Sequence, residues 1–475
     1  MIAILLVLAT FIGVGFSPPL TSAAPLTSTL ADQSQVALTI YNSNIGLVKD
    51  VRDITLAAGE NELQFMDVAA QIMPPTVHIK SLTDAQGLRV LEQNYEYDLL
   101  SPEKLMEKYV GKEVKLLDKN YYTGQDQLIT ATLLSTTGSP IYQVGNEIHI
   151  GLPGRVILPQ IPENLIAKPT LVWLLRSTTA SKQKVEASYL TGDITWQADY
   201  VTVLSADDTK ADLSGWVTID NKSGATYKNA TLKLVAGDVH RVQPKVMYER
   251  AMAMDAAQAA PPPQFREEGF FEYHLYTLDR PATVKDKQTK QMTLLSATGI
   301  PVTKRLILQG QQMYFFNPYS PDDEMPPQKV SVYLEIENAQ KNNLGLPLPK
   351  GTIRAYKADK DGNLQFVGED QIDHTPKDET VKVKMGEAFD ILGRRKQTEF
   401  KRIARTVSEM SWEITVRNHK QEDVTVRVNE PVPGDWEVLS ASHKYEKADA
   451  HTLRFDVPVP KDGEVKISYR VRVKM

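Results

Sequence analysis

The clearest pattern along the chain is a strict alternation of apolar and polar residues near its C-terminal end. From Glu464 to Lys474 the residues alternate between the two kinds. Because successive side chains of a β-strand point to opposite faces, this period of two predicts a half-buried strand. The preceding Pro460–Gly463 has the composition of a turn, in which Gly463 is able to adopt a positive φ.

The same alternation recurs in earlier parts of the chain. It is seen in Val330–Ile336, Val381–Met385, Trp412–Val416 and Val424–Val428. Short strands separated by Gly, Asn, Asp and Pro turns are typical of antiparallel sandwiches or barrels. We therefore predict an all-β fold of tandem antiparallel β-sandwich modules, with a small barrel-like insertion and very little helix.

One helix is expected, over Ser101–Tyr109, because Ser101 is a good N-cap, Pro102 suits the first helical position and Gly111 follows the end. Leu105, Met106 and Tyr109 would share its buried face. The following residues, 111–162, read as about five short strands with glycine turns. This stretch is predicted to form the barrel-like insertion.

Two proline-rich stretches interrupt the strand pattern, at 247–269 and 317–328. The first holds three consecutive prolines, which cannot donate ladder hydrogen bonds, so it is predicted to be a disordered Ala/Met/Pro loop. The length of the chain predicts several modules. The expected division is a signal peptide at 1–24, part of a β-sandwich at 25–95, the helix and barrel-like insertion at 96–165, one sandwich at 166–325 and a C-terminal sandwich at 326–475.

The first residues have the character of a secretory signal. Met1–Phe16 is almost wholly apolar and small residues follow, with possible cleavage after Ala23 or Ala24. The run is shorter than the ~18 apolar residues of a membrane-spanning helix. No Lys or Arg precedes it, so a retained anchor and a buried N-terminal strand or helix remain alternatives. No transmembrane segment is expected beyond the signal.

Composition narrows the chemistry. The chain has no cysteine, which excludes disulfides, cysteine nucleophiles, thiolate metal sites and lipid attachment through an N-terminal cysteine. Its 54 basic and 59 acidic side chains give a net charge of −5, too balanced for a dedicated nucleic-acid binder.

A weak internal echo links two segments, Trp216–Asn221 and Trp412–Asn418. Each runs from a tryptophan through a β-branched strand to an asparagine, and then through a polar turn into a second strand. We interpret the echo as two sandwich modules that share a local pattern, and not as proof of duplication.

A set of motifs resembles the bacterial domain of unknown function 4139 family. The resemblance covers residues 185–475 and implies an exported β-rich protein, with no reaction attached. That family is similar in turn to the mucoidy-inhibitor-like proteins, although their coiled coil has no counterpart here. The motifs that carry the resemblance are Ser188–Tyr200, Gly215–Asn221, Leu232–Asp238, Glu272–Leu278, Leu346–Tyr356, Val367–Asp370 and Asp373–Glu379.

The histidines give no catalytic or metal-binding signature. No two are spaced i, i+4, and no HExxH, GxSxG, P-loop or GxGxxG motif occurs. Asp373–His374 and Asp238 with His240 place a carboxylate near an imidazole, as a general base requires, but such pairs are common in loops. His443 and His451 flank a turn-rich segment that is able to bring them together, but surface positions are the favoured interpretation.

Two further patterns have metal-binding alternatives. Asp359–Asn363 has oxygen ligands at alternate positions, but its glycine comes too early for a calcium loop, so a hairpin turn is favoured. The thioether sulfurs of three methionines, Met247, Met252 and Met254, are soft ligands of the kind that binds cuprous ions. The simpler interpretation is that they are methionines of a mobile linker. No metal, cofactor or catalytic residue is predicted.

The sharpest charge feature is Gly393–Thr406, where six basic residues and one acidic residue sum to +5. It is either a solvated strand face with paired charges or a site for an anionic envelope polymer. The aromatic residues form either a sugar-stacking platform or, more commonly for strand residues, part of the core. They are Trp196, Tyr200, Trp216, Trp412 and Trp436.

These observations favour an exported bacterial envelope protein, periplasmic or secreted, of unknown function. We expect a non-catalytic binding or scaffolding protein whose partner is an anionic envelope polymer or another envelope protein. The alternative is an envelope hydrolase with an acid/base pair assembled from loops, drawing on Asp373, His374 or Asp238.

Overall fold

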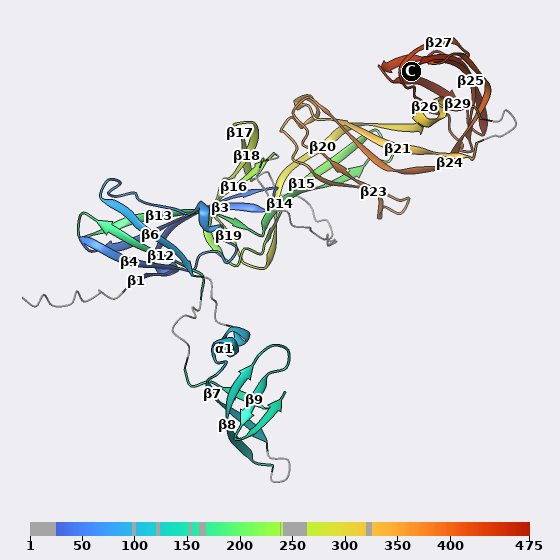
Figure 1. Ribbon diagram of the computed structural model, residues 1–475. Helices are drawn as coiled ribbons and strands as arrows, with labels where there is room; N and C mark the ends of the chain where they lie inside the picture. Colours follow the sequence, from blue (N-terminus) through green and yellow to red (C-terminus); the bar gives the residue numbers. More distant parts are fainter. Residues whose placement is uncertain are drawn as a thin grey trace, which may run out of the picture. The chain divides into compact units, whose positions relative to one another are not determined.

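The computed structural model describes residues 25–96, 101–119, 124–151, 154–160, 168–237, 239–240, 264–319 and 325–475 (Figure 1). The predicted all-β class is confirmed, because strands dominate and the described residues contain a single α-helix. They divide into two compact units. Unit 1 holds the residues up to 35 and residues 49–189, and unit 2 holds residues 36–48 and 190–475.

Unit 1 contains a four-stranded sheet in the order β1-β4-β12-β6. Strand β12 is antiparallel to both of its neighbours, whereas β1 is parallel to β4. Phe65 on β4 packs edge-on against Trp173 on β12, and both are fully buried. The strands of the sheet are β1 (Leu26–Ser28), β4 (Gly59–Met66), β6 (Leu88–Glu96) and β12 (Thr170–Ser177).

The remaining elements of this part of the chain include an antiparallel pair of β5 with β13. Strands β3 and β13 each contribute residues to both units. The strands are β3 (Ile45–Leu56), β5 (His78–Ser81) and β13 (Ser181–Gly192), and two short 3₁₀ helices are η1 (Leu30–Asp32) and η2 (Pro74–Thr76).

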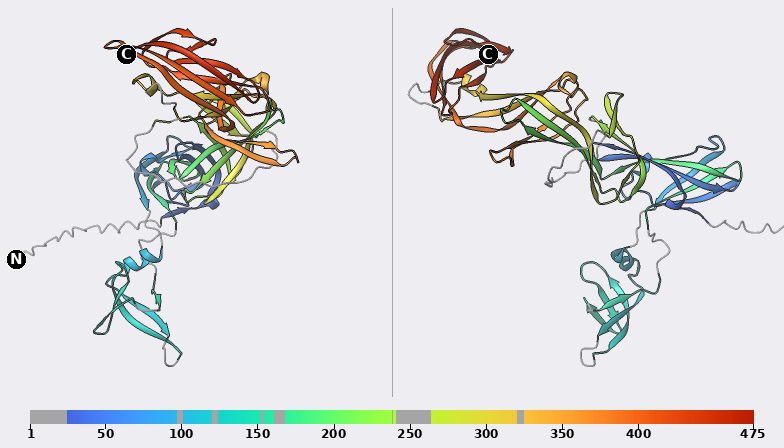
Figure 2. Two further views of the ribbon diagram at one scale, coloured as in Figure 1. Left: turned by 90° about the vertical axis from the view of Figure 1, so that its right-hand side faces the viewer. Right: turned by 180° about the vertical axis from the view of Figure 1, so that it is seen from behind.

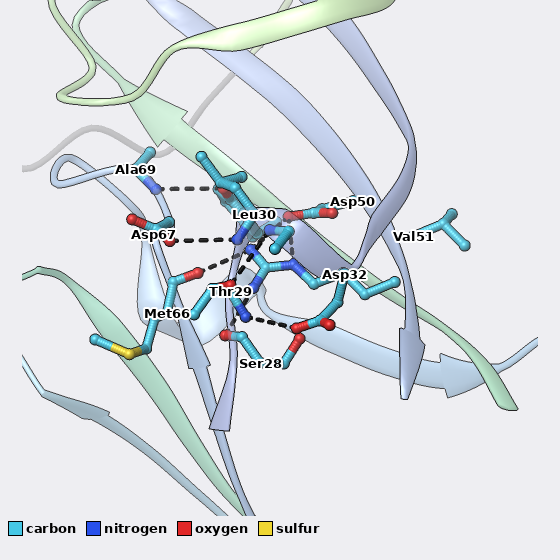
Figure 3. Close-up of polar contacts among 12 residues, drawn as sticks. Ser28, Thr29, Leu30, Asp32, Asp50, Val51, Met66, Asp67 and Ala69 are labelled. Atoms are coloured by element: carbon cyan, nitrogen blue, oxygen red, sulfur yellow. Dashed lines mark hydrogen bonds and ion pairs between the residues drawn. The ribbon is translucent and has the colours of Figure 1, made fainter. Parts of the chain in front are cut away.

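A buried arginine joins three strands of unit 1 through hydrogen bonds to Ser28, Asp50 and Met66, which are labelled in Figure 3. Arg52 on β3 donates to the main-chain oxygens of Ser28 on β1 (3.0 Å) and Met66 on β4 (2.8 Å). It also pairs with Asp50 (2.8 Å), and its guanidinium lies 3.5 Å from the ring centroid of Phe65. Because its charge is compensated in this way, Arg52 is able to be fully buried.

The predicted helix is present as α1 (Pro102–Lys108). The Ser101 hydroxyl accepts a hydrogen bond from the N–H of Lys104 (3.2 Å), and Gly111 has a positive φ of 81° just beyond the end. Both features are those of a helix with an N-cap and a glycine stop. Tyr109 is buried, and Met106 packs against the same core.

Five strands follow α1, as the sequence predicted, and form one sheet in the order β10-β9-β8-β7-β11. The order is that of an open sheet, with β10 and β11 at its two edges, and α1 lies at one end of it (Figures 1 and 2). Its small core includes Leu116, Leu133 and Tyr142. The strands are β7 (Glu113–Lys119), β8 (Asp126–Ser135), β9 (Ile141–Val144), β10 (Glu147–Ile150) and β11 (Arg155–Ile157).

Unit 2 begins with a sheet in which β16 lies between β2, to which it is parallel, and β18, to which it is antiparallel. Strands β17 and β18 form a hairpin. The strands are β2 (Gln33–Tyr41), β16 (Tyr227–Ala236), β17 (Phe265–Phe270), β18 (Tyr273–Leu278) and β19 (Ala282–Val284).

A second, 13-stranded sheet runs in the order β23-β22-β14-β15-β20-β21-β24-β25-β30-β27, with β26, β28 and β29 off this path. Its strands are β14 (Ile194–Leu204), β15 (Lys210–Asn221), β20 (Gln288–Gln309), β21 (Gln328–Glu337), β22 (Gly351–Ala358), β23 (Leu364–Ile372), β24 (Thr380–Ala404), β25 (Val407–Asn418), β26 (Val424–Pro431), β27 (Asp435–Ala441), β28 (Glu446–Asp449), β29 (Thr452–Val459) and β30 (Gly463–Lys474). Two short 3₁₀ helices, η3 (Gln312–Phe315) and η4 (Gln340–Asn342), lie in the connections before and after β21.

Two long strands carry this sheet into the C-terminal sandwich. The first part of β20 pairs with β15, and its last residues pair with β21 and β26. The first part of β24 pairs with β21, and its second part pairs with β25. Figure 2 shows these strands from two sides. Each long strand therefore serves two neighbouring parts of unit 2.

The core of the C-terminal sandwich lies between β24, β25, β30 and β27 on one side and β26 and β29 on the other. Apolar residues of several of the predicted strands face this core, including Trp412, Val428 and Tyr469. The predicted turn before β30 is also present, since the N–H of Gly463 donates to Pro460 O (3.2 Å). The positive φ, however, is at Asp462 (48°) and not at Gly463, because aspartate tolerates the left-handed region.

The asparagines at the ends of the two similar segments, Asn221 and Asn418, form the same kind of turn. Asn221 and Asn418 are both buried. Each side-chain oxygen accepts from the main-chain N–H two residues on (3.1 and 3.0 Å), and each amide donates to the carbonyl four residues on (2.9 and 2.8 Å). The shared sequence pattern therefore corresponds to a shared turn. The two tryptophans differ, because Trp412 is buried and Trp216 is half-buried.

Within the part of the chain that the structure describes, no helix is both long enough and apolar enough to cross a membrane.

Candidate functional site

The histidines do not gather into a metal site. Across the described ranges, no group of three or more His, Asp or Glu side chains is arranged to hold a metal ion. Two carboxylate–imidazole pairs form among the described residues, one between Glu267 on β17 and His274 on β18 (2.7 Å) and one between Glu147 and His149 on β10 (3.4 Å). Sequence reasoning did not predict the contact between Glu267 and His274. A prediction that β17 and β18 form a hairpin would have placed the two residues close together.

Two of the predicted acid/base candidates, Asp373 and His374, form local hydrogen bonds. The Nδ1 atom of His374 accepts a hydrogen bond from the main-chain N–H of Lys350 (3.1 Å), so this nitrogen is used to hold the backbone. Asp373 accepts the hydroxyl of Thr375 through its carbonyl oxygen (2.9 Å). Asp238 lies outside the described residues.

The calcium-like sequence forms the β22–β23 hairpin turn that was favoured. One carboxylate oxygen of Asp359 accepts the N–H groups of Asp361 (3.0 Å) and Asn363 (2.9 Å). The other accepts the side-chain amide of Gln365 (2.9 Å), and Gly362 adopts a φ of 85°. The carboxylate is thus occupied by its own turn. Met247, Met252 and Met254 lie outside the described residues.

The aromatic residues belong mainly to the core. Trp196, Tyr200, Trp412 and Trp436 are buried, and only Trp216 is half-buried. The indole of Trp196 donates to Val235 O (3.1 Å), and the hydroxyl of Tyr200 donates to Pro349 O (2.8 Å). Burial raises the pKa of Tyr200 well above its usual value. These contacts favour the core interpretation over a sugar-stacking platform.

The basic stretch separates into a buried and an exposed part. Arg395 is fully buried and donates from Nε (3.1 Å) and Nη2 (2.6 Å) to Glu430 on β26. The hydroxyl of Tyr469 on β30 donates to the other oxygen of Glu430 (2.9 Å). Burial raises the pKa of Tyr469 well above its usual value, and the neighbouring carboxylate of Glu430 adds to the effect. Arg395 is therefore part of the core and not of a binding face.

The exposed part lies where β24 turns into β25. Lys401, Arg402 and Arg405 are all exposed there, and none of the three forms an ion pair with another described residue. We call these three residues the basic tip. Ile403, between them, is 47% exposed. Lys474 on β30 is also exposed and lies opposite Val407, at the same end of the sheet.

The carboxylate opposite Lys401 in the register, that of Glu409, is already engaged by other cations. Glu409 on β25 accepts hydrogen bonds from Arg470 (2.7 Å) and Arg472 (2.7 and 2.9 Å). The hydrogen bonds from Arg472 and then Arg470 lower the pKa of Glu409. Although Lys401 lies opposite Glu409 in the register, the carboxylate is shared by two arginines, and the basic tip keeps its positive charge.

Two adjoining hollows open in the surface of unit 2. They share Asp208, Lys304, Leu306 and Lys420. The first, which we call the polar hollow, has a volume of about 400 Å³ and includes Arg427 and Asp456. The hydrogen bond from Arg427 (2.8 Å) lowers the pKa of Asp456. The second, the apolar hollow, has a volume of about 350 Å³.

Asp208 fixes the wall between the two hollows. It lies in the β14–β15 turn with a φ of 59° and accepts Lys304 on β20 (2.7 Å) and Lys357 on β22 (2.5 Å). Burial acts to raise its pKa, but the two lysines outweigh burial and lower it. No sequence motif indicated this arrangement, because its residues come from strands far apart along the chain.

The comparison with known families agrees with the sequence resemblance. The chain matches the family described as Domain of unknown function (DUF4139) over residues 185–475. No curated protein sequence matches the chain. The match covers more than half of the chain and includes both hollows, the basic tip and the buried Arg395. The chain therefore belongs to the DUF4139 family.

Proposed function

We propose that the protein is exported to the bacterial envelope and acts there without catalysis, as a binding or scaffolding protein for an anionic polymer. The apolar segment Met1–Phe16, followed by small residues, supports export because it has the form of a secretory signal. The absence of cysteine is compatible with an oxidising compartment.

The basic tip is the observation that carries the polymer-binding proposal. Its three cations are exposed at the end of a hairpin, and they are not neutralised by described carboxylates. The buried Arg395 provides the contrast within the same stretch, since its charge is compensated by Glu430. The chain as a whole is net acidic, but a local group of exposed cations still attracts a polyanion. The attraction depends on the charges near the binding surface more than on the net charge of the protein.

A polymer fits this surface better than a small anion. Neither of the two hollows described above is lined by a residue of the basic tip. A flat group of cations binds mainly by electrostatic attraction, which salt screens over about 10 Å at 0.1 M ionic strength. Several weak contacts with one long polyanion add together, whereas a single small anion makes only one.

The proposal is tested with fluorescently labelled dextran sulfate as the polyanion. Binding to the purified protein is measured by anisotropy between 50 and 300 mM salt. We expect the affinity to fall steeply with salt, because screening weakens each contact. The triple variant Lys401→Glu, Arg402→Glu, Arg405→Glu should bind at least about tenfold more weakly, because three attractions become repulsions.

The matched control is Lys360→Glu, Lys377→Glu, Lys461→Glu. It makes the same change in net charge at three exposed residues of other turns or loops. Dextran sulfate should bind this variant nearly as well as it binds the unchanged protein. Equal losses in the two variants, or binding that salt does not weaken, would show that the basic tip is not a polyanion site.

A further inference from the structure

The turn at the end of the β24–β25 hairpin carries an exposed isoleucine among its cations. The register shifts between Arg402 and Ala404, so that Ile403 has no partner on β25. An unpaired residue of this kind is a β-bulge, and bulges redirect side chains. Ile403 is 47% exposed, and every residue from 401 to 406 is exposed. The bulge therefore presents an aliphatic side chain to solvent between Arg402 and Arg405.

This turn holds the three cations of the basic tip and no carboxylate. On the neighbouring strands Lys474 lies opposite Asp435, and Arg470 and Arg472 hold three glutamates. Together with the turn, these side chains are six basic and four acidic, a net of +2, which stays positive when a terminal carboxylate at Met475 is counted. The excess positive charge therefore belongs to the turn itself. The glutamates are Glu399, Glu409 and Glu437.

Cations around an exposed aliphatic side chain fit an anionic lipid surface better than a free polymer. A hydrophilic polyanion offers anionic groups but no apolar region for Ile403. A bilayer offers both, because its acyl chains begin directly below the charged head groups. Neither hollow includes a residue of the turn, so the ligand is met by projecting side chains and not by a cavity.

We propose that the basic tip docks on the surface of an anionic lipid bilayer. Lys401, Arg402 and Arg405 contact the phosphate groups of the lipid heads, for which the forked guanidinium of arginine is well suited. Ile403 enters the apolar layer below them. The inference rests on the proposed function for the exposed cations of the basic tip, and it adds a ligand that also engages Ile403.

The docking is tested by co-sedimentation of the purified protein with phosphatidylcholine vesicles that contain phosphatidylglycerol. We expect binding that added salt weakens, and little binding to phosphatidylcholine alone, because the attraction requires anionic head groups. The triple variant Lys401→Glu, Arg402→Glu, Arg405→Glu should bind the anionic vesicles at least about 100-fold more weakly. The charge-matched control variant with three glutamates in other turns or loops should bind nearly as well as the unchanged protein.

The variant Ile403→Ser separates the bilayer from the polymer. It should weaken binding to the anionic vesicles about fivefold, because the apolar contact is lost. Binding of dextran sulfate should not change, because the cations remain. The matched control is Leu364→Ser on β23, which removes an aliphatic side chain that is 56% exposed. This control should bind the vesicles like the unchanged protein.

A fluorescent label locates the contact, because the chain has no cysteine of its own. The variant Ile403→Cys therefore takes up a single nitrobenzoxadiazole label, whose emission rises and shifts to the blue in an apolar environment. We expect both changes with the anionic vesicles and neither with dextran sulfate. The same label on Lys360→Cys, an exposed position in the β22–β23 turn, should respond to neither ligand.

The failure of this inference is distinguishable from the failure of the proposed function. A protein that binds dextran sulfate but no anionic vesicles, or a label at residue 403 that stays in water on the vesicles, overturns the docking and leaves polymer binding intact. Equal vesicle binding by Ile403→Ser and Leu364→Ser also overturns the docking. Vesicle binding without binding of dextran sulfate overturns polymer binding and supports the docking, and a protein that binds neither overturns both.

Discussion

Arg395 shows how far the role of a single residue depends on its surroundings. In the sequence it lies between Arg394 and Lys396 and counts as one more surface cation. In the folded chain the alternation of β24 turns Arg395 inward, where its guanidinium donates to the carboxylate of Glu430. The hydroxyl of Tyr469 donates to the other oxygen of the same carboxylate. The residue that permits this burial is 35 positions away, which a local pattern does not reveal.

We predict that Arg395→Met lowers the free energy of unfolding by about 3–5 kcal/mol, because Glu430 is left buried without its cation. Urea unfolding followed by circular dichroism measures the change. The double variant Arg395→Met, Glu430→Leu should recover most of the stability, because it removes both charges.

The control for this prediction is Arg427→Met. Arg427 pairs with Asp456, whose side chain is 49% exposed. Water solvates that carboxylate when its partner is lost, and the expected cost is at most about 1 kcal/mol for the ion pair. A comparable loss in Arg395→Met and Arg427→Met would contradict the argument that burial makes the difference.

At the scale of elements, local patterns predicted several of the observed strands and turns and the one helix of the described residues. The strands with period-two alternation are present, α1 begins after its predicted N-cap, and the Asp359 turn closes a hairpin. The echo between Asn221 and Asn418 corresponds to one turn used twice. The pairing of the strands was not predictable in this way, because β14 pairs with β22 about 150 residues later.

The first strand leads to a prediction about processing. Strand β1 begins at Leu26, and the carbonyl of Ser28 is held by the buried Arg52. If the signal is removed, cleavage must leave these residues in place for unit 1 to keep its edge strand. We expect the exported protein to begin at Ala24 or Pro25, as determined by N-terminal sequencing and intact mass.

The outcome that would contradict this expectation is a mature chain that starts at Thr27 or later. Such a chain would lack part of β1, and Arg52 would lose its partner at Ser28. A protein that retains Met1 would instead favour the retained anchor.

At the scale of the molecule, the helix and the five-stranded sheet form an insertion into another sheet. Strands β6 and β12 flank the insertion and pair directly, with Glu96 opposite Thr170. The insertion also has a core of its own, which includes Tyr109 and Leu133. A segment whose ends meet in one ladder and whose core is separate is expected to be removable.

We therefore predict that replacing residues 97–169 by Asn-Gly leaves the rest of the chain folded. A two-residue turn of this type joins antiparallel strands directly. The main thermal transition should move by less than about 5 °C, because the four-stranded sheet keeps its ladders. A chain that no longer unfolds cooperatively would show that the insertion supports unit 1.

The sequence alone was sufficient for the all-β class, the alternation within strands, the single helix and several turns, because each depends on residues within about ten positions. It was insufficient for the buried Arg395 and the two hollows. Those features arise where distant strands meet: the apolar hollow draws on residues from Leu204 to Lys420. Burial and pairing are properties of the neighbours that folding brings together, and no local pattern contains them.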